Sequence, residues 1–289
     1  MCICASGPAD AAPTRAPLQE FNRKATELAL AITVWLLYNK IVCAQRAVWT
    51  GCAANHQINK EGVSAMPDSV TVSALFDLSR SLAGEWLAQF QYPWEALAGI
   101  QDFILSAGPA LWEDYREISP SVWVHKTAVV APTAFLGAPC IIGPETEVRH
   151  CAFVRGSALV GAGCVVGNSV ELKNVILFDK VQTPHYNYVG DSILGYRSHM
   201  GAGSITSNVK SDKTLVEVHL PGGEKLATGR KKFGAMLGDG VEVGCNSVLN
   251  PGTVVGRNTN IYPVSCVRGV IPPDSIVKTG GVIVRKREA

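Results

Sequence analysis

The chain has 289 residues, of which 47% are hydrophobic and 17% are charged, with 28 glycines. This length fits one large domain or two smaller ones, and the apolar content excludes an intrinsically disordered chain. The formal net charge is +2, and residues 66–289 carry equal numbers of basic and acidic side chains, so no broad basic field exists for nucleic acid or anionic lipid.

An apolar run from Leu28 to Tyr38 lies within the first 65 residues. It has about half of the ~20 residues that a membrane span requires, and more than twenty mixed residues precede it, unlike a secretory signal. An amphipathic helix or a signal-like stretch are alternatives. We predict that residues 1–65 are a poorly defined or dispensable extension, that Met66 is the true start, and that the protein does not enter membranes.

Residues 66–118 are predicted to form a helical segment. Asp68 or Ser69 can cap a first helix, and Pro93 suits the first turn of a second. The apolar positions recur at spacings of three and four: Val72, Leu75, Phe76, Leu82, Trp86 and Leu87, then Leu97, Ile100, Phe103 and Ile104. Short amphipathic helices cannot bury their apolar faces alone, so we expect them to pack on the following domain or on a neighbouring subunit.

A period of six residues begins at Val122 and continues to about Val270. The chain divides there into hexads such as VWVHKT, ALVGAG and VEVGCN, and the third place of each is apolar. These third places are Val124, Val130, Leu136, Ile142, Val148, Val154, Val160, Val166, Leu172, Phe178, Leu194, Met200, Leu237, Val243, Leu249, Val255, Ile261 and Val267. Hexapeptide repeats mark parallel β-helices, in which each hexad is one short strand and a corner. We predict an all-β fold, a left-handed parallel β-helix over residues 119–285.

The period fails at residues 179–191 and 208–234. Loops that leave a regular scaffold usually carry the functional residues, so we expect the site near these two interruptions.

Nine cysteines occur, and none forms a C-x-x-C pair, so a zinc ribbon or a thioredoxin-like centre has no support. Several occupy small-residue places of the repeat, where a thiol is a compact apolar filler. Reduced, packed cysteines predict a cytoplasmic protein.

The interruptions resemble a known family. The stretch from Arg155 to Asn208 is similar to the acetyltransferase half of the bifunctional N-acetylglucosamine-1-phosphate uridylyltransferase/glucosamine-1-phosphate N-acetyltransferase. The segments PHYNYVGDSILG, GAGSITSN and GRKKFGAMLGDGVEVGCNSVLNPG resemble the C-terminal β-helix of archaeal-type sugar-1-phosphate nucleotidylyltransferases. The resemblance covers about residues 120–285.

The resemblance implies a CoA-dependent N-acyltransferase that acts on an amino-sugar 1-phosphate, such as glucosamine 1-phosphate, in UDP-N-acetylglucosamine or related nucleotide-sugar synthesis. It implies a homotrimer, with acetyl-CoA between neighbouring β-helices and no metal. Nothing in residues 1–118 resembles the nucleotidylyltransferase domain, so that activity is predicted to be absent.

The resemblance also assigns a catalytic centre. It makes His185 of PHYNYVGD the catalytic base, Tyr188 its partner and Asn208 a ligand of the sugar. The chemistry fits, because a sugar amine is largely protonated at neutral pH and a histidine with a pKa near ~6.5 can take its proton.

The phosphate is assigned to Arg155, Lys173 and Lys232, where Arg offers a planar fork and Lys a point charge. Arg155 and Lys173 are three hexads apart, so the period itself predicts that they stack on one face in adjacent coils. The acetyl-CoA cleft is assigned to Ala202, and the three backbone amides from Gly201 to Gly203 are available to polarise the thioester carbonyl.

Two departures leave the acceptor and the acyl chain open. His199 and Val209 stand where the acetyltransferase family has asparagine and tyrosine. A γ-carbonic-anhydrase-like metalloenzyme is an alternative on the same fold, with histidines at 125, 150, 185 and 199 as candidate ligands. A non-catalytic sugar-nucleotide-binding assembly module is another.

Overall fold

The computed structural model describes residues 67–111 and 113–287. The predicted extension over residues 1–65 lies outside them. No helix in this described part of the chain is long and apolar enough to cross a membrane.

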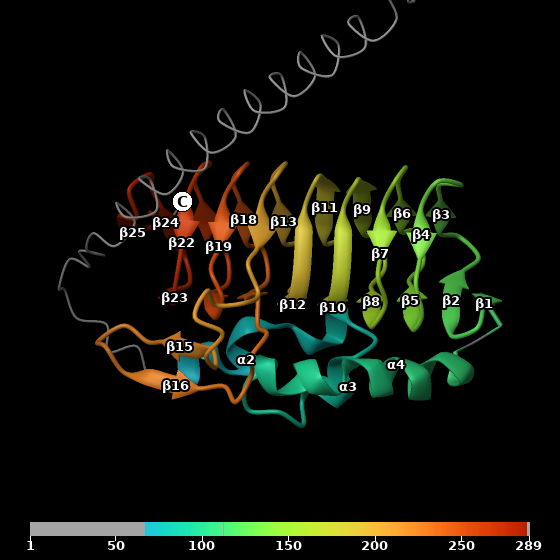
Figure 1. Cartoon of the computed structure of the whole chain (residues 1–289), viewed down its shortest axis with the longest axis horizontal. Coiled ribbons are helices and arrows are strands. Elements are labelled where there is room, and N and C mark those ends of the chain that lie inside the picture. The colour runs from blue at the N-terminus through green and yellow to red at the C-terminus, as the bar shows by residue number, and fades with distance from the viewer. Residues whose placement is uncertain (1–66, 112, 288–289) are drawn as a thin grey trace, which may run out of the picture. The chain divides into compact units, whose positions relative to one another are not determined.

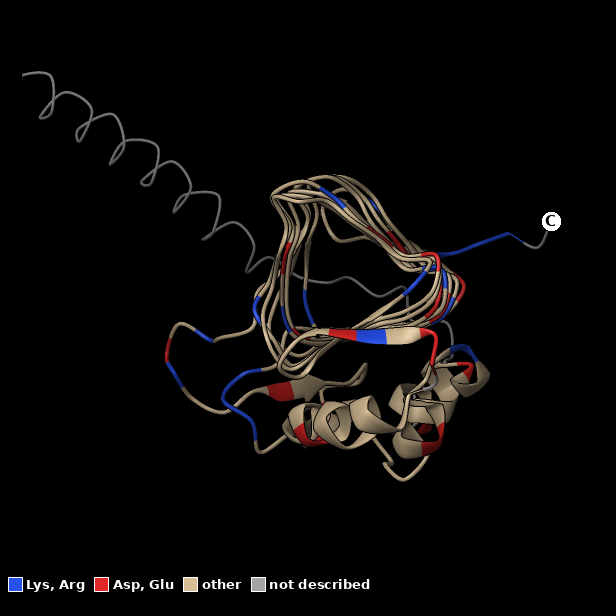
Figure 2. Ribbon diagram, turned by 90° about the vertical axis from the view of Figure 1, so that its right-hand side faces the viewer, with Lys and Arg blue, Asp and Glu red and all other residues tan. Residues whose placement is uncertain are grey.

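Residues from Val122 onward form a left-handed parallel β-helix of about nine coils, as the hexads predict. The coils are stacked in one row, and their outline is triangular when seen along the row (Figures 1 and 2). Each coil contributes short strands to three faces, which we call the polar face, the apolar face and the covered face.

The polar face is a sheet whose outward side chains include Glu147, Gln182 and Glu242. Its parallel strands are β3 (Val129–Val130), β6 (Glu147–Val148), β9 (Val165–Asn168), β11 (Gln182–His185), β13 (His199–Met200), β18 (Glu242–Val243), β21 (Asn260–Ile261) and β24 (Ser275–Val277). A final strand, β25 (Ile283–Arg285), pairs antiparallel with β24.

The apolar face carries a register column of outward side chains that are mostly hydrophobic. The column is Phe135, Phe153, Glu171, Tyr188, Ile205, Val248 and Cys266. Its short strands are β4 (Phe135–Leu136), β7 (Phe153–Val154), β14 (Ile205–Thr206), β19 (Val248–Leu249) and β22 (Cys266–Val267). The longer strands β10 (Glu171–Leu177) and β12 (Tyr188–Leu194) begin on this face and turn the corner onto the next.

The covered face lies beneath the helical segment, and most of its outward side chains are buried like the inward ones. Its strands are the ends of β10 and β12 together with β2 (Val122–His125), β5 (Cys140–Ile142), β8 (Ala158–Val160), β17 (Ala235–Leu237), β20 (Thr253–Val255) and β23 (Val270–Ile271). Ile141, Leu159 and Ile193 point outward here, yet none is more than 1% exposed. Strand β1 (Tyr115–Ser119) pairs antiparallel with β2 at the first coil.

Residues 67–111 fold against the covered face of their own chain, which decides between the two expected packing partners (Figures 1 and 2). The amide of Asp77 donates to Asp239 Oδ2 at 2.7 Å, and Asn174 Nδ2 donates to the carbonyl of Leu97 at 3.1 Å. The elements are η1 (Pro67–Val70), α2 (Val72–Leu75), η2 (Leu78–Arg80), α3 (Gly84–Leu87), η3 (Pro93–Ala98), α4 (Ile100–Ala107) and η4 (Gly108–Ala110).

The first expected helix is divided into short turns. Its cap is Thr71, whose hydroxyl accepts from the amide of Ala74, and not Asp68 or Ser69. The chain then folds back so tightly that a Cβ on Gly84 would overlap the carbonyl of Leu78, which prevents one continuous helix.

The segment from 179 to 191 is not the loop that the failed period predicts. It stays within the β-helix, because β11 and β12 pair in register with β9 and β10. The coil is only one residue shorter there, since Leu177 pairs with Val160 and Leu194 with Leu177. The stacked third place is therefore Leu177 and not Phe178, whose ring packs against Phe76 with centroids 5.0 Å apart.

The second interruption is a true excursion. It contains the hairpin of β15 (Glu217–His219) and β16 (Lys225–Ala227), drawn beside the coils in Figure 1. The hairpin lies close to the β-helix, because a Cβ on Gly252 would be 2.8 Å from the carbonyl oxygen of Glu217.

The five cysteines of the described residues are free. Cys140 and Cys164 are buried fillers, as expected, and burial raises the pKa of both thiols to about 12. Cys151, Cys245 and Cys266 are exposed, so the prediction of packing was wrong for these three.

Candidate active site

Asp191 is the centre of a polar cluster at the corner between the apolar and covered faces. It is 2% exposed, and its carboxylate accepts from Lys173 Nζ at 3.1 and 3.2 Å. Asn174 Nδ2 donates to it at 3.0 Å and Asn208 Nδ2 at 2.6 Å. The parallel register of β10 and β12 places Lys173 beside Gly190, so the lysine reaches the aspartate of the next coil. Sequence reasoning selected Lys173 and Asn208 but missed the carboxylate that joins them.

Arg155 lies directly beside Lys173 in the preceding coil, as the eighteen-residue spacing predicts, because Val154 pairs with Leu172. Its guanidinium Nη1 donates to Glu171 Oε1 at 2.8 Å. The two cations therefore share a face, but each is already paired with a carboxylate.

Tyr188 begins β12 between Glu171 and Ile205 of the neighbouring coils. Asn208 Nδ2 donates to the Tyr188 hydroxyl at 3.2 Å, which joins the phenol to the Asp191 cluster. Burial raises the pKa of the Tyr188 hydroxyl above its ordinary value, and the carboxylates of Asp191 and Glu171 add to the rise. The phenol therefore stays protonated at neutral pH and can donate a hydrogen bond to a ligand.

His185 ends β11 on the polar face, three residues before Tyr188 begins β12 on the apolar face. It therefore lies at the corner between these two faces. Its side chain is exposed and makes no hydrogen bond or ion pair with any residue that the structure describes. An exposed, unpaired imidazole is free to meet a ligand at this corner.

The GAG turn of the next coil stands beside His185. Gly203 N donates to the His185 carbonyl at 3.0 Å, and the seventeen-residue offset of these coils aligns Ala202 with His185. The buried Asn187 fixes the turn, because its Nδ2 donates to the Gly201 carbonyl at 2.8 Å. Sequence reasoning missed Asn187.

Not all backbone amides of this turn are free to donate a hydrogen bond to the thioester carbonyl. Gly201 N donates to Val243 O at 2.7 Å, and Gly203 N is used by His185. The Ala202 amide donates to no atom of the described residues. The expected polarising role therefore narrows from three amides to the one of Ala202.

Lys232 stands at the end of the excursion. The next two residues tie the chain to the cluster, because Phe233 N donates to Asn208 O at 3.0 Å and Gly234 N to Asp191 O at 2.8 Å. Lys232 itself is exposed and forms no ion pair within residues 67–111 and 113–287.

The other histidines of the candidate metal set, at 125, 150 and 199, have polar partners of their own. His150 Nδ1 lies 3.0 Å from Thr133 Oγ1, and His199 Nδ1 lies 2.9 Å from Glu242 Oε2. Within the part of one chain that the structure describes, no group of three or more His, Cys, Asp or Glu is arranged to hold a metal ion.

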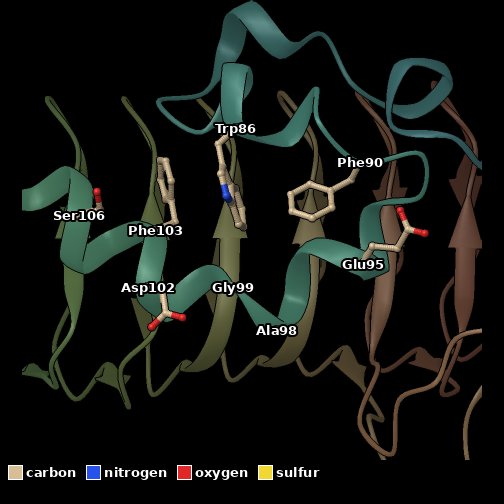
Figure 3. Close-up of a pocket in the computed structure, with 8 residues that line it drawn as sticks. All are labelled: Trp86, Phe90, Glu95, Ala98, Gly99, Asp102, Phe103 and Ser106. Carbon is tan, nitrogen blue, oxygen red and sulfur yellow. The ribbon is translucent and has the colours of Figure 1, made fainter.

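A groove of about 430 Å³ on the helical segment is separate from this corner (Figure 3). It is lined by Trp86, Phe90 and Phe103, and Trp86 stacks on Phe103 with ring centroids 4.8 Å apart. None of the predicted site residues lines it.

No protein-family model matches the chain. A bifunctional protein GlmU of Methanococcus maripaludis is 32% identical to it over 211 residues, which cover 71% of this chain and 51% of that protein. A bifunctional sugar-1-phosphate nucleotidylyltransferase/acetyltransferase of Sulfurisphaera tokodaii is 33% identical over 96 residues, 33% of this chain and 24% of that one. A solved hexapeptide transferase family protein of Anaplasma phagocytophilum aligns at 14% identity with a TM-score of 0.33, over 57% of this chain and 78% of that chain. The chain spans about half or less of the length of these two curated relatives.

Proposed function

We propose that this chain, a hexapeptide-repeat β-helix protein homologous to GlmU-type bifunctional proteins, is a CoA-dependent N-acyltransferase that acts on an amino-sugar 1-phosphate. The observation that carries the proposal is the apolar face with its two corners. An unpaired imidazole and a free backbone amide stand at its corner with the polar face, and a basic cluster joined to a protonated phenol stands at its corner with the covered face, in adjacent coils.

His185 would act as the general base. The acceptor amine loses a proton to the imidazole, and its lone pair forms a C–N bond to the thioester carbonyl carbon. The C–S bond then breaks, the departing CoA sulfur takes the proton back from His185, and the second proton of the former ammonium group leaves the nitrogen for water. An exposed imidazole without a competing hydrogen bond suits both transfers.

The Ala202 amide would stabilise the oxyanion that develops on the thioester carbonyl. It stands one coil above His185, and it is the amide of the turn that lacks a partner in the described residues. A backbone donor fixed in this way costs no reorganisation when the charge appears. Gly201 and Gly203 would shape the acyl-CoA cleft through their backbone.

Tyr188 and Asn208 would bind sugar hydroxyls, and the phosphate end of the acceptor would lie on the basic side of the site, beside Arg155, Lys173 and Lys232. The hydrogen bond from Asn208 to Tyr188 fixes the two side chains relative to each other before the sugar arrives. Fixed polar groups of this kind orient a substrate at low entropic cost. The acceptor would be glucosamine 1-phosphate or a related amino sugar of UDP-N-acetylglucosamine synthesis.

The apolar face would be the contact between copies in a homotrimer. Phe135 is 58% exposed and Phe153 is 43% exposed, and their rings stand 5.6 Å apart on this face. Tyr188 belongs to the same outward column, so a neighbouring copy here would also enclose the site. The free cysteines fit a reducing compartment, and we place the protein in the cytoplasm.

The test is an assay of acyl transfer from acetyl-CoA to glucosamine 1-phosphate and to galactosamine 1-phosphate. The rate is measured from the free CoA thiol that is released. His185→Ala should lower kcat by about 10²- to 10⁴-fold, the usual loss when a general base is removed. His150→Ala, also an exposed histidine, is the matched control and should keep the wild-type kcat. An undiminished kcat in His185→Ala would overturn the mechanism. Saturable binding of a sugar nucleotide without turnover of any acyl-CoA would indicate the non-catalytic module instead.

A further inference from the structure

The cations assigned to the phosphate are not equally free to bind it. Arg155 is 2.8 Å from Glu171, and Lys173 is 3.1 Å from Asp191. A phosphate that approached either cation would also meet the carboxylate of the pair. Part of the attraction is therefore cancelled before any ligand arrives.

Arg230 differs from both. It lies near the end of the excursion, where its carbonyl accepts from Val216 N at 2.8 Å. Its side-chain Nε is buried and has no hydrogen-bond partner in the described residues, and no carboxylate there forms an ion pair with its guanidinium. A buried, unsatisfied donor on a cation is costly, so a native structure seldom keeps one without a ligand or a water.

Arg230 lies on the segment that leads into the Asp191 cluster. Four residues later, Gly234 N donates to Asp191 O at 2.8 Å, and Phe233 N donates to Asn208 O at 3.0 Å. Burial lowers the pKa of the Arg230 guanidinium, and the nearby Asp191 carboxylate opposes that shift. The carboxylate itself already accepts from Lys173, Asn174 and Asn208, and among the described residues no other acceptor pairs with the guanidinium of Arg230.

We propose that Arg230 is the principal group that binds the acceptor phosphate, assisted by Lys231 and Lys232. Arg155 and Lys173 then act mainly as positioning residues, which hold Glu171 and Asp191. The inference rests on the proposed function for the identity of the acceptor. A phosphate dianion can accept two parallel hydrogen bonds from a guanidinium, which a lysine cannot supply in the same geometry.

The test measures binding and turnover separately. Calorimetry with glucosamine 1-phosphate, glucosamine and inorganic phosphate compares the wild type with Arg230→Gln and Arg230→Lys. Arg230→Gln should raise the Kd for glucosamine 1-phosphate about 10- to 100-fold, as expected for a lost charge-assisted hydrogen bond. The Kd of Arg230→Lys for glucosamine 1-phosphate should lie between those of the wild type and Arg230→Gln. The Kd for glucosamine should stay unchanged in both variants. Inorganic phosphate should compete with glucosamine 1-phosphate only where residue 230 is cationic.

Lys225→Gln is the matched control, since it removes one positive charge from the same excursion but from a pair with Glu217, 3.2 Å away. It should keep the wild-type Kd. The Tm of ligand-free Arg230→Gln should equal or exceed that of the wild type, because the variant removes an uncompensated, half-buried charge. A variant that unfolds instead would show that Arg230 is a structural residue, against the proposal.

The two proposals can fail independently. Binding of glucosamine 1-phosphate that depends on Arg230, without acyl transfer, would support the phosphate site and overturn the proposed reaction. Acyl transfer with an unchanged KM for glucosamine 1-phosphate in Arg230→Gln would overturn the phosphate site and leave the reaction standing.

Discussion

Asp191 organises three side chains, two from the preceding coil and one from the start of the excursion. Lys173 and Asn174 belong to β10, and Asn208 follows β14. All three donate to one carboxylate whose residue has a φ of 49°, in the left-handed region that Asp and Asn tolerate better than most residues. The position therefore requires both an acceptor with two oxygens and an unusual backbone.

Replacing Asp191 should destabilise the fold as well as the site. Asp191→Ala leaves Lys173 and two amide groups without their acceptor in a largely buried place, which should lower the free energy of unfolding by about 1–3 kcal/mol. Urea denaturation followed by circular dichroism measures the change. Asp212→Ala, at an exposed aspartate of the excursion, is the control and should shift the midpoint much less. Equal midpoints for wild type and Asp191→Ala would contradict the central role of this carboxylate.

The signal for Asp191 was present in the sequence. Asp191 follows Lys173 by eighteen residues, the spacing that places Arg155 beside Lys173, and the one-residue shortening of this coil still leaves Asp191 within reach of the lysine. Because residues 179–191 were expected to form a loop, the repeat spacing was not applied across them, and Asp191 was missed. Arg230 had no comparable signal, because the excursion has no period from which its neighbours could be computed.

At the scale of elements, a close approach of two coils lets the segment PHYNYVGD stay within the β-helix. The strands β9 and β11 approach so closely that a Cβ on Gly167 would overlap the carbonyl of Pro184 in the next coil. The atoms that the Cβ would meet all belong to the Pro184 backbone, so no flexible side chain can move aside. Gly167 is thus required by the approach of two coils and not by its own dihedral angles.

This close approach predicts a large difference between two glycines. Gly167→Ala should lower the free energy of unfolding by at least ~3 kcal/mol, as other severe overpacking does. Gly222→Ala, in the hairpin turn, meets no atom within 4 Å and only strains a φ of 102°, at a cost of about 1 kcal/mol. Thermal unfolding of both variants measures this difference as a difference in Tm. Similar Tm values for the two would show that the coils can separate locally.

The β-helix was predictable because its signal is local and repeated. Each inward aliphatic, such as Val154 or Val160, is fixed by its place within six residues. The helical segment was predictable only as helical. Its division into short turns depends on contacts with a distant face, including the bond from Asp77 to Asp239. Such long-range contacts leave no period in the sequence.

At the scale of the whole molecule, the three faces of the β-helix are unequal. One is covered by residues 67–111, one is polar, and one exposes Phe135 and Phe153. Exposed aromatic pairs on a flat face are typical of contacts between proteins.

Phe153→Asp should therefore convert the proposed trimer into monomers. A charge placed in the column beside Phe135 would be desolvated on association, while the exposed side chain contributes little to the monomer fold. Light scattering after size-exclusion chromatography measures the mass. Val129→Asp, at a side chain that is 65% exposed on the polar face, is the control and should keep the wild-type mass. A trimer that persists in Phe153→Asp would place the contact on another face.

The two ends of the row of coils determine whether identical molecules can polymerise end to end. A stack of parallel strands offers unpaired backbone groups at its first and last coil, and identical molecules can add there without limit to make a fibre. Here β1 lies antiparallel across β2 at one end, and β25 lies antiparallel across β24 at the other. A reversed strand presents the wrong spacing of donors and acceptors to an incoming parallel coil. Each end of the row thus has one of its three faces closed by a reversed strand, and removal of either strand should favour head-to-tail polymers.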